Sequence, residues 1–289
     1  MKLHFLKTTW SDIIILQDNN KVALIDTGFA DQFEQIKDYL DKINIKNISF
    51  ILLTHFHRDH YGSISKLVNN YNVEKVYFKN YSNLDKTTAW GTLADDEYRN
   101  KERKKCDNLK KIINKKSELI NVENINEINF NGYILKIYKN NNLIKEIYED
   151  KNYSDTYHKI RYNENLNSIA VFMKINGVNI LLGGDITDMQ DEHPKANYVN
   201  YQIATTINEE IDIYKVPHHG TNYCNSTKTL NIYKPKLAII TNGIDYLENE
   251  SSIFEDLKRA NKNIKILLTE NNNIVVNISK DGSINYEEN

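Results

Sequence analysis

A short apolar run followed at once by a cluster of histidines constrains the fold of this chain more than any other feature. Residues 50–53 read Phe-Ile-Leu-Leu, which suits a β-strand buried on both faces. Four side chains that commonly bind metals come next: His55, His57, Asp59 and His60. Only 8 histidines occur in 289 residues, so a polar loop that holds three of them by coincidence is the weaker interpretation. A metal site at the end of a strand is therefore predicted.

The spacing of these four side chains favours two metal ions over one. His55 and His57 lie two residues apart, so in an extended backbone they project to the same side. Asp59 and His60 are neighbours and point apart, which lets them reach a second position. Imidazole nitrogens and carboxylate oxygens are typical ligands of zinc, with manganese and iron as alternatives. We therefore expect two zinc ions per chain.

Two further apolar runs lead into carboxylates. Asp26 follows residues 22–25, and Asp185 follows residues 178–182 and two glycines. Each could be an ordinary turn residue that makes local hydrogen bonds. In a chain that also carries the histidine cluster, Asp185 is predicted to bridge the two cations, because its negative charge would hold them close together. Asp26 is predicted to line the site.

Two adjacent histidines follow another predicted strand, residues 211–216, in the sequence Pro-His-His-Gly. One of them should bind the second metal, which leaves the other free to bind substrate or to move a proton. We assign His218 as the ligand and His219 to the second role, although spacing alone does not order two neighbours. Lys215, in the same strand, either adds positive charge near the site or lies on a solvated face.

The alternation of predicted strands and helices indicates an α/β fold. Residues 30–43 have apolar side chains at helical spacing before the histidine-bearing strand, and a helix at 63–68 and a strand at 73–78 follow it. The C-terminal part repeats this alternation. Two such halves face to face would form a four-layer αββα sandwich with the site along one edge. We expect one domain, residues 1–289, with an inserted helix and loop region at about 80–165 near the site.

Composition narrows the class of protein further. The chain has 37 basic and 39 acidic residues, which excludes a globally basic nucleic-acid-binding domain but leaves room for a local basic groove. Cys106 and Cys224 are the only cysteines, and we expect two reduced, unpaired thiols. We find no signal peptide and no apolar run of membrane-spanning length. A cytoplasmic location is expected; an extracellular one would follow if a leader had been removed.

The pattern His-x-His-x-Asp-His after an apolar strand resembles the signature of the metallo-β-lactamase fold superfamily. Two branches resemble this chain in further motifs. The metallo-hydrolase domain of bacterial DNA-uptake channel proteins also has Asn-Ser, here at 167–168, and Lys-x-Pro-His-His-Gly, here at 215–220. Phosphorylcholine esterase catalytic domains are similar at 76–82 and 182–185. The resemblance implies that Asp26 acts behind the metal ligands, where it would accept a hydrogen bond from one of them.

One departure from the superfamily pattern bears on the substrate. True β-lactamases and glyoxalase II-type thioesterases carry a further ligand histidine in the middle of the chain, beside a glycine. Neither His158 nor His193 stands in such a setting, and Asn167 occupies the region instead. The first metal would then hold the first histidine pair, Asp185 and water, which leaves an open coordination position. The departure disfavours β-lactams and thioesters, and both similar branches imply phosphoesters.

These observations predict a binuclear zinc-dependent hydrolase, a phosphodiesterase whose nucleophile is a hydroxide formed from metal-bound water. The predicted metal ligands are His55, His57, Asp59, His60, Asp185 and His218. Asp59 would also orient the nucleophile, His219 would stabilise a phosphate oxygen or protonate the leaving group, and Asn167 would donate to the substrate. Asp26 and Lys215 would support the ligands from behind.

Three other functions are alternatives to a phosphodiesterase. A phosphorylcholine esterase needs aromatic side chains around a quaternary ammonium, and Trp90 and the tyrosines within 148–162 are candidates. A lactone or thioester hydrolase would use the same metals. A non-catalytic metal-binding protein is least favoured, because the whole predicted ligand set is present. The substrate would be a small or polymeric phosphoester, with nucleic acid among the candidates, and the sequence does not indicate the oligomeric state.

Overall fold

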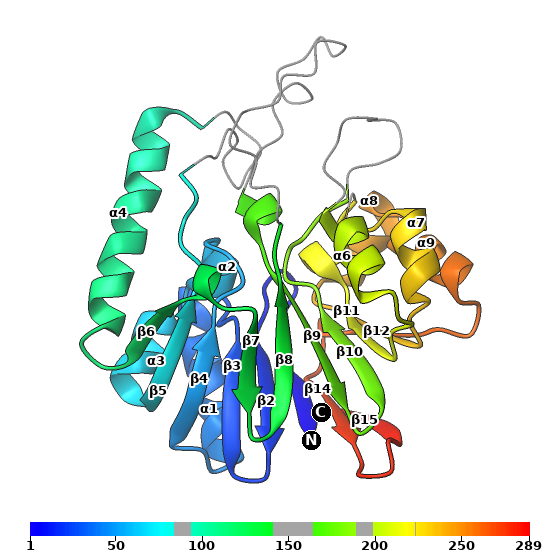
Figure 1. Cartoon of the computed structure of the whole chain (residues 1–289), viewed down its shortest axis with the longest axis horizontal. Helices are drawn as coiled ribbons and strands as arrows, with labels where there is room; N and C mark the ends of the chain where they lie inside the picture. Colours follow the sequence, from blue (N-terminus) through cyan, green and yellow to red (C-terminus); the bar gives the residue numbers. More distant parts are fainter. Residues whose placement is uncertain (84–93, 141–163, 189–198, 223) are drawn as a thin grey trace.

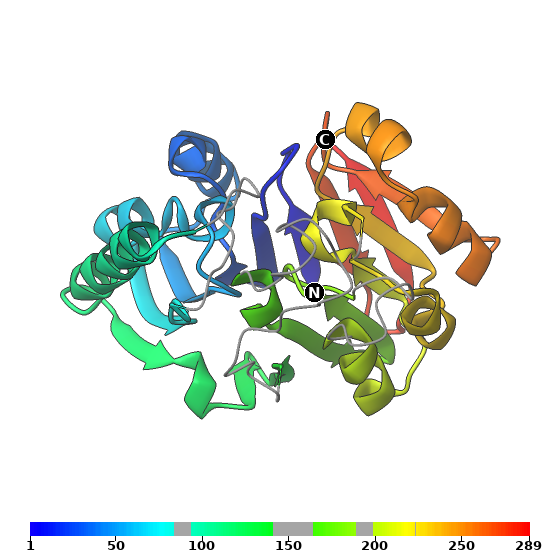
Figure 2. The same cartoon turned by 90° about the horizontal axis from the view of Figure 1, so that it is seen from above.

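Two β-sheets pack face to face, and helices cover both outer faces (Figures 1 and 2). The structure is a computed structural model that describes residues 1–83, 94–140, 164–188, 199–222 and 224–289. The predicted four-layer αββα sandwich is therefore confirmed. Trp90, the tyrosines within 148–162, His158 and His193 lie outside the described residues.

The first sheet has eight strands, and the four at one end of it are parallel and connected by helices. Its strands, in spatial order, are β15 (Ile284–Glu288), β14 (Ile274–Ile278), β1 (Lys2–Phe5), β2 (Ile14–Asp18), β3 (Lys21–Ile25), β4 (Asn47–Leu52), β5 (Asn72–Phe78) and β6 (Glu118–Asn121). Strands β3 to β6 run parallel, and the others pair antiparallel. The predicted histidine-bearing strand is β4, near the centre of this parallel part.

The second sheet has seven strands and repeats the arrangement with a different connectivity. In spatial order they are β13 (Lys265–Leu268), β12 (Leu237–Ile240), β11 (Ile213–Lys215), β10 (Val178–Leu182), β9 (Ala170–Ile175), β8 (Tyr133–Tyr138) and β7 (Glu127–Phe130). Strands β10 to β13 are parallel, and β7 to β10 are antiparallel. The predicted hairpin at Asn176-Gly177 joins β9 to β10.

Alternate side chains of each central strand enter two different cores. Ile25 and Leu52 of the first sheet and Val171 and Ile239 of the second belong to one buried cluster between the sheets. The opposite face of β4, represented by Ile51, packs with the helices that cover the first sheet. Because both faces are buried, these strands contain runs of consecutive apolar residues rather than a strict alternation, which is why the sequence marks them clearly.

The helices divide between the two outer layers. On the first sheet lie α1 (Phe33–Lys42), α3 (Ile64–Asn70) and α4 (Asp96–Ile113); the second half of the chain contributes α6 (Val199–Ile207), α7 (Thr227–Tyr233), α8 (Ile244–Glu250) and α9 (Ile253–Ala260). Helix α4 runs along the flank of the molecule and packs with α3 and β6 (Figure 1). Its buried side chains, Cys106, Leu109 and Ile113, form a thin apolar stripe, and the helix lies within the predicted insertion at about 80–165.

Three elements were not expected from the sequence. Helix α6 is rich in β-branched and amide side chains, which have modest helix propensity, so its helical form depends on packing against α7. Helix α8 is short and acidic. Strand β15 is almost wholly exposed at the sheet edge. Both cysteines are free and buried, as expected. Among the described residues, no helix is both long enough and apolar enough to cross a membrane.

Candidate metal centre

The site forms where the carboxyl ends of four parallel strands meet at one edge of the sandwich. The residues concerned follow these strands directly: Asp26 after β3, residues 54–60 after β4, Asp185 shortly after β10 and residues 217–220 after β11. The register between β3 and β4 pairs Ile25 with Leu52, and the Asp26 amide donates to the Leu52 carbonyl at 2.9 Å. The fold therefore brings together side chains that are far apart in the sequence.

The turn after β4 is fixed by close backbone packing. Asp26 accepts hydrogen bonds from the Thr54 amide at 2.8 Å and from the Thr54 hydroxyl at 2.7 Å. A short helix, α2 (Arg58–Tyr61), follows the turn and ends at Gly62, where a Cβ would lie 2.4 Å from the Ala30 amide nitrogen. Only glycine fits at this position. The turn is thus held at both ends.

A first group of potential ligands contains His55, His57 and Asp185. His55 Nε2 lies 3.0 Å from His57 Nδ1 and 3.6 Å from Asp185 Oδ2. Ligands that surround one zinc ion tetrahedrally at about 2.1 Å lie about 3.4 Å from each other, so these separations suit a shared cation. His55 is fully buried and His57 is half-buried, so this group is open on the His57 side.

A second group contains four residues: Asp59, His60, Asp185 and His219. His60 Nε2 lies 3.3 Å from Asp185 Oδ2, and His219 Nε2 lies 3.4 Å from Asp59 Oδ2. Within the described part of the chain, the Nε2 atoms of His60 and His219 have no hydrogen-bond partner although they are buried. Buried polar atoms normally find partners, so their convergence on the same two carboxylates indicates a position for a cation.

The other ring nitrogen of each buried histidine is bonded in a way that fixes its tautomer. His60 Nδ1 donates to Asp26 Oδ2 at 2.7 Å, which is the contact expected of Asp26. His219 Nδ1 donates to the Thr241 hydroxyl at 2.9 Å, and that hydroxyl donates to Asp12 Oδ1 at 2.7 Å. Because Nδ1 keeps its proton for these acceptors, Nε2 is the ring nitrogen that can present a lone pair to a cation, as in metal-ligating histidines.

The charges of the two groups differ. Burial alone would raise the pKa of Asp185, but His60 and His219 hold it well below its usual range. Burial would lower the pKa of His219, but Asp185 and Asp12 raise it to about 9; the pKa of His60 is likewise raised well above its ordinary value. Burial and the nearby His60 lower the pKa of His55 well below the usual range. Without a metal, the protons on His60 and His219 balance the negative charge of the buried carboxylates in the second group. A bound cation could supply that positive charge instead.

The structure reverses the expected order of the two adjacent histidines. His219, and not His218, lies in the second group. His218 Nε2 lies 2.9 Å from Asn165 Nδ2, and His218 Nδ1 lies 2.7 Å from the Thr221 hydroxyl, so both ring nitrogens are bonded. The reason is the backbone: His218 and His219 both have left-handed torsions, with φ of 49° and 52°, which turn the second ring toward the cluster.

Lys215 and Asn167 both lie in buried settings. Lys215 takes the position behind the cluster and not the solvated face; its ammonium pairs with Asp12 and donates to the Gly184 carbonyl at 3.2 Å. It therefore neutralises Asp12 behind the cluster. Asn167 was expected to face substrate, but its amide donates to Glu164 Oε1 at 2.9 Å. Asn165, two residues earlier, is the asparagine that contacts a histidine of the site.

Several supporting residues were missed in the sequence. Asp12 and Thr241 carry the contact to His219, and Thr54 lies 3.1 Å from His55 Nδ1. A usable signal existed for all three, because each is a polar residue at the end of an apolar strand run. Asn165 and Thr221 had no such signal, because their contact with His218 depends on the folded arrangement of the loops.

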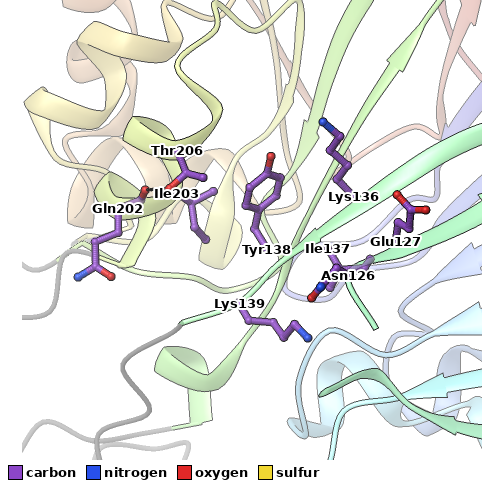
Figure 3. A pocket seen from close by; sticks show the side chains of 9 residues that line it. All are labelled: Asn126, Glu127, Lys136, Ile137, Tyr138, Lys139, Gln202, Ile203 and Thr206. Carbon is purple, nitrogen blue, oxygen red and sulfur yellow. Dashed lines mark hydrogen bonds between the residues drawn. The ribbon is translucent and has the colours of Figure 1, made fainter. Parts of the chain in front are cut away.

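A separate pocket of about 400 Å³ lies between the end of β8 and α6 (Figure 3). Its lining is formed by Asn126, Glu127, Lys136, Ile137, Tyr138, Lys139, Gln202, Ile203 and Thr206. The Lys139 ammonium donates to the backbone carbonyls of Glu123 at 2.9 Å and Ile125 at 2.7 Å, so its charge supports the local fold. No predicted site residue lines this pocket.

Comparisons with known proteins agree with this geometry. Residues 11–120, which contain the turn after β4, match the sequence model of the metallo-beta-lactamase superfamily. Among solved structures, Tm1679, a metal-dependent hydrolase of the β-lactamase superfamily, aligns over 100% of both chains with a TM-score of 0.54 and 14% identity. The metallo-beta-lactamase fold protein YhfI from Bacillus subtilis aligns over 99% of both chains with a TM-score of 0.52 and 12% identity. No curated protein matches the sequence. The protein thus has the metallo-β-lactamase fold, and its residues 11–120 are similar to the metallo-beta-lactamase superfamily.

Proposed function

We propose that this protein is a metal-dependent hydrolase that uses two divalent cations, zinc by preference, to cleave phosphodiesters. One observation carries the proposal: Asp185 Oδ2 faces both ligand groups, 3.6 Å from His55 Nε2 and 3.3 Å from His60 Nε2. A carboxylate between two histidine sets can hold two cations close together, which is the arrangement that phosphoester hydrolysis uses. The nitrogen and oxygen donors favour zinc.

Each residue of the cluster has a role in this proposal. When bound, the two cations would lower the pKa of a water molecule toward neutrality and offset the negative charge that develops on the phosphoryl group. His55 and His57 would hold the first cation, Asp59, His60 and His219 would hold the second, and Asp185 would serve both. His219 lies in the second group, so this proposal gives it the role of a ligand and not the protonation of the leaving group.

Asp59 is the residue that we expect to orient the attacking water. Its side chain is 14% exposed, against 2% for that of Asp185, so it is the carboxylate of the second group that solvent can reach. It can therefore accept a hydrogen bond from an incoming water and orient it. His218 forms the adjoining wall. Burial lowers the pKa of His218 to about 4, so its ring is neutral at physiological pH and adds no charge that would compete with the cations.

The preference for phosphodiesters is supported by the composition of the first group. It has two histidines and one shared carboxylate among the described residues, so a cation there would keep coordination positions for substrate oxygens. The half-buried His57 marks the side from which a substrate can approach. The similarity to phosphoester-cleaving branches at residues 167–168 and 215–220 points the same way.

The test combines metal analysis with a choice of substrates. Chelator-treated protein is reloaded with zinc, and its zinc content is measured beside hydrolysis of bis-p-nitrophenyl phosphate and p-nitrophenyl phosphorylcholine. We expect two zinc ions per chain and diester cleavage that chelator abolishes and zinc restores. Much faster cleavage of the choline ester would identify that substrate class instead. Two bound zinc ions with turnover of lactones or thioesters alone would contradict the phosphodiesterase assignment, and a zinc-free protein would contradict the metal centre.

A further inference from the structure

An exposed tryptophan stands beside the second ligand group. The Trp10 side chain is 37% exposed, one of three large apolar side chains at the surface of the described residues. Its ring centroid lies 5.9 Å from that of His219 with the planes tilted by 34°. Tyr246 of α8 meets Trp10 edge to face, with centroids 4.9 Å apart and planes at 89°. The two rings form a right-angled aromatic corner, Trp10 with Tyr246, next to His219.

The loop that carries Trp10 is held firmly, so the exposure of the ring is a fixed feature. The Thr8 amide donates to the Thr269 carbonyl at 3.0 Å, and the Thr269 hydroxyl donates to the Thr8 carbonyl at 2.8 Å. The Ser11 hydroxyl donates to Gln32 at 2.7 Å. Exposing a large apolar ring to water is unfavourable, so a rigid loop that does so beside a cluster of polar groups suggests a ligand-binding surface.

The corner is also tied to the backbone that positions His219. Trp10 pairs with Asn242 in an isolated antiparallel bridge, and the Asn242 amide group donates to the His219 carbonyl at 2.9 Å. Asn242 therefore sets the position of the indole relative to His219, through a backbone bridge to Trp10 and a side-chain hydrogen bond to the His219 carbonyl. If a substrate ring stacked on Trp10, a short ester linkage would be long enough to place its phosphoryl group at the second ligand group.

We propose that the aromatic corner binds a neutral aromatic ring on the substrate and thereby selects aryl or heteroaryl phosphoesters. The inference deepens the proposed function and rests on a phosphoryl group at the cluster. Two rings at right angles offer one face for offset stacking and one edge for a perpendicular contact, which are the favoured geometries of aromatic pairs. The charged residues of α8 are all acidic, Asp245, Glu248 and Glu250, so an anionic substituent would be repelled there.

The test measures binding and needs no turnover. Zinc-loaded protein is titrated by calorimetry with phenylphosphonate and methylphosphonate, which differ only in the ring. We expect phenylphosphonate to bind about tenfold more tightly, because stacking and burial of the ring favour it. Trp10→Ala should remove this ratio by weakening phenylphosphonate alone, and Trp10→Phe should retain most of it. Tyr286→Ala, which removes an equally exposed ring on β15, is the matched control and should change neither constant.

Four results would overturn the inference: equal affinities in the wild-type protein, no binding of either phosphonate, a ratio that survives Trp10→Ala, or a variant that loses methylphosphonate and zinc as well. The last would assign Trp10 to the support of His219. A third probe, 2-(trimethylammonio)ethylphosphonate, separates a ring from an organic cation; if it showed the largest Trp10-dependent gain, the corner would be a cation site. Because phosphonates are not hydrolysed, a protein that binds them as expected but cleaves no diester would refute the proposed function and leave the aromatic corner standing.

Discussion

The two ligand groups that share Asp185 differ in how completely the protein surrounds them. The second group has four residues, and both of its histidines are backed by fixed acceptors, Asp26 and Thr241. The first group has three residues, and His57 is half-buried. The difference suggests a division of labour: the second group would hold its cation tightly, and the first would hold one that shares its coordination shell with the substrate.

Replacing Asp185 should have the largest effect, because it removes the residue common to both groups. We expect Asp185→Asn to bind less than one zinc ion per chain and to lose at least about 1000-fold in diester hydrolysis, since a neutral amide cannot balance two cations. Elemental analysis and initial rates measure this. The thermal unfolding curve of the zinc-free variant serves as the folding control. Retention of two zinc ions would show that the groups do not depend on a shared carboxylate.

Replacing each of the adjacent histidines separates a ligand from a wall residue. We expect His219→Ala to lose the zinc ion of the second group and to lower hydrolysis about 100-fold or more, whereas His218→Ala should keep two zinc ions. The two variants are matched, because both remove an imidazole from the same turn, half-buried at His218 and buried at His219. If His218→Ala lost a zinc ion and His219→Ala kept both, His218 would be the ligand.

Replacing the hydroxyls behind the histidines should show how separately the two groups are supported. Thr241→Val removes the acceptor of His219 Nδ1 alone. Thr54→Val removes a hydroxyl that lies near His55 Nδ1 and also donates to Asp26 behind His60. Residues in such positions typically contribute 10- to 100-fold to metal affinity, so about that loss is expected at the second group only for Thr241→Val and at both groups for Thr54→Val. Competition with a chromophoric chelator measures both constants. Equal losses at both groups for Thr241→Val would mean that the groups are not separately supported.

The smallest expected effect is the dependence of metal affinity on pH. Without metal, the pKa of His219 is raised to about 9 and that of His60 is also raised, whereas the pKa of His55 is lowered. A cation must displace protons from the second group only. Its affinity should therefore rise with pH up to about 9, about tenfold per unit for each proton displaced, while the first group changes little. Calorimetry in buffers of different ionisation enthalpy counts these protons. Equal release at both groups would contradict the difference in charge.

Much of the fold could be predicted because the buried strands are locally distinctive. Strands β4 and β10 end in runs of consecutive apolar residues, 50–52 and 180–182, that lead toward the polar residues of the site, and α1 has its apolar side chains at helical spacing. Helix α6 and strand β15 could not be found in this way. The sequence of α6 favours no helix by itself, and β15 is an edge strand with little buried surface. Both elements depend on neighbours that the sequence does not reveal.

The residues of the candidate site likewise divide into those that local spacing predicts and those that depend on tertiary contacts. His55, His57, Asp59 and His60 could be grouped from the sequence because their relation is set by spacing within one turn. Which of His218 and His219 faces the cluster depends on two consecutive residues with left-handed torsions. Asn167 does not face the site because its side chain donates to Glu164, and Asn165 contacts His218 instead. Such choices are made by tertiary contacts, so no local pattern could have decided them.

The sheet edge that assembles the centre has a consequence for biosynthesis. During translation the turn from His55 to His60 emerges early, whereas Asp185 and His219 leave the ribosome much later. A nascent chain could therefore capture a cation weakly through four neighbouring side chains before its second half exists. Only after the strands β10 and β11 have docked could that cation gain its remaining ligands. Under the proposed function, stable metal retention would report completion of the whole chain, and a truncated product would release its cation to chelators in the cell.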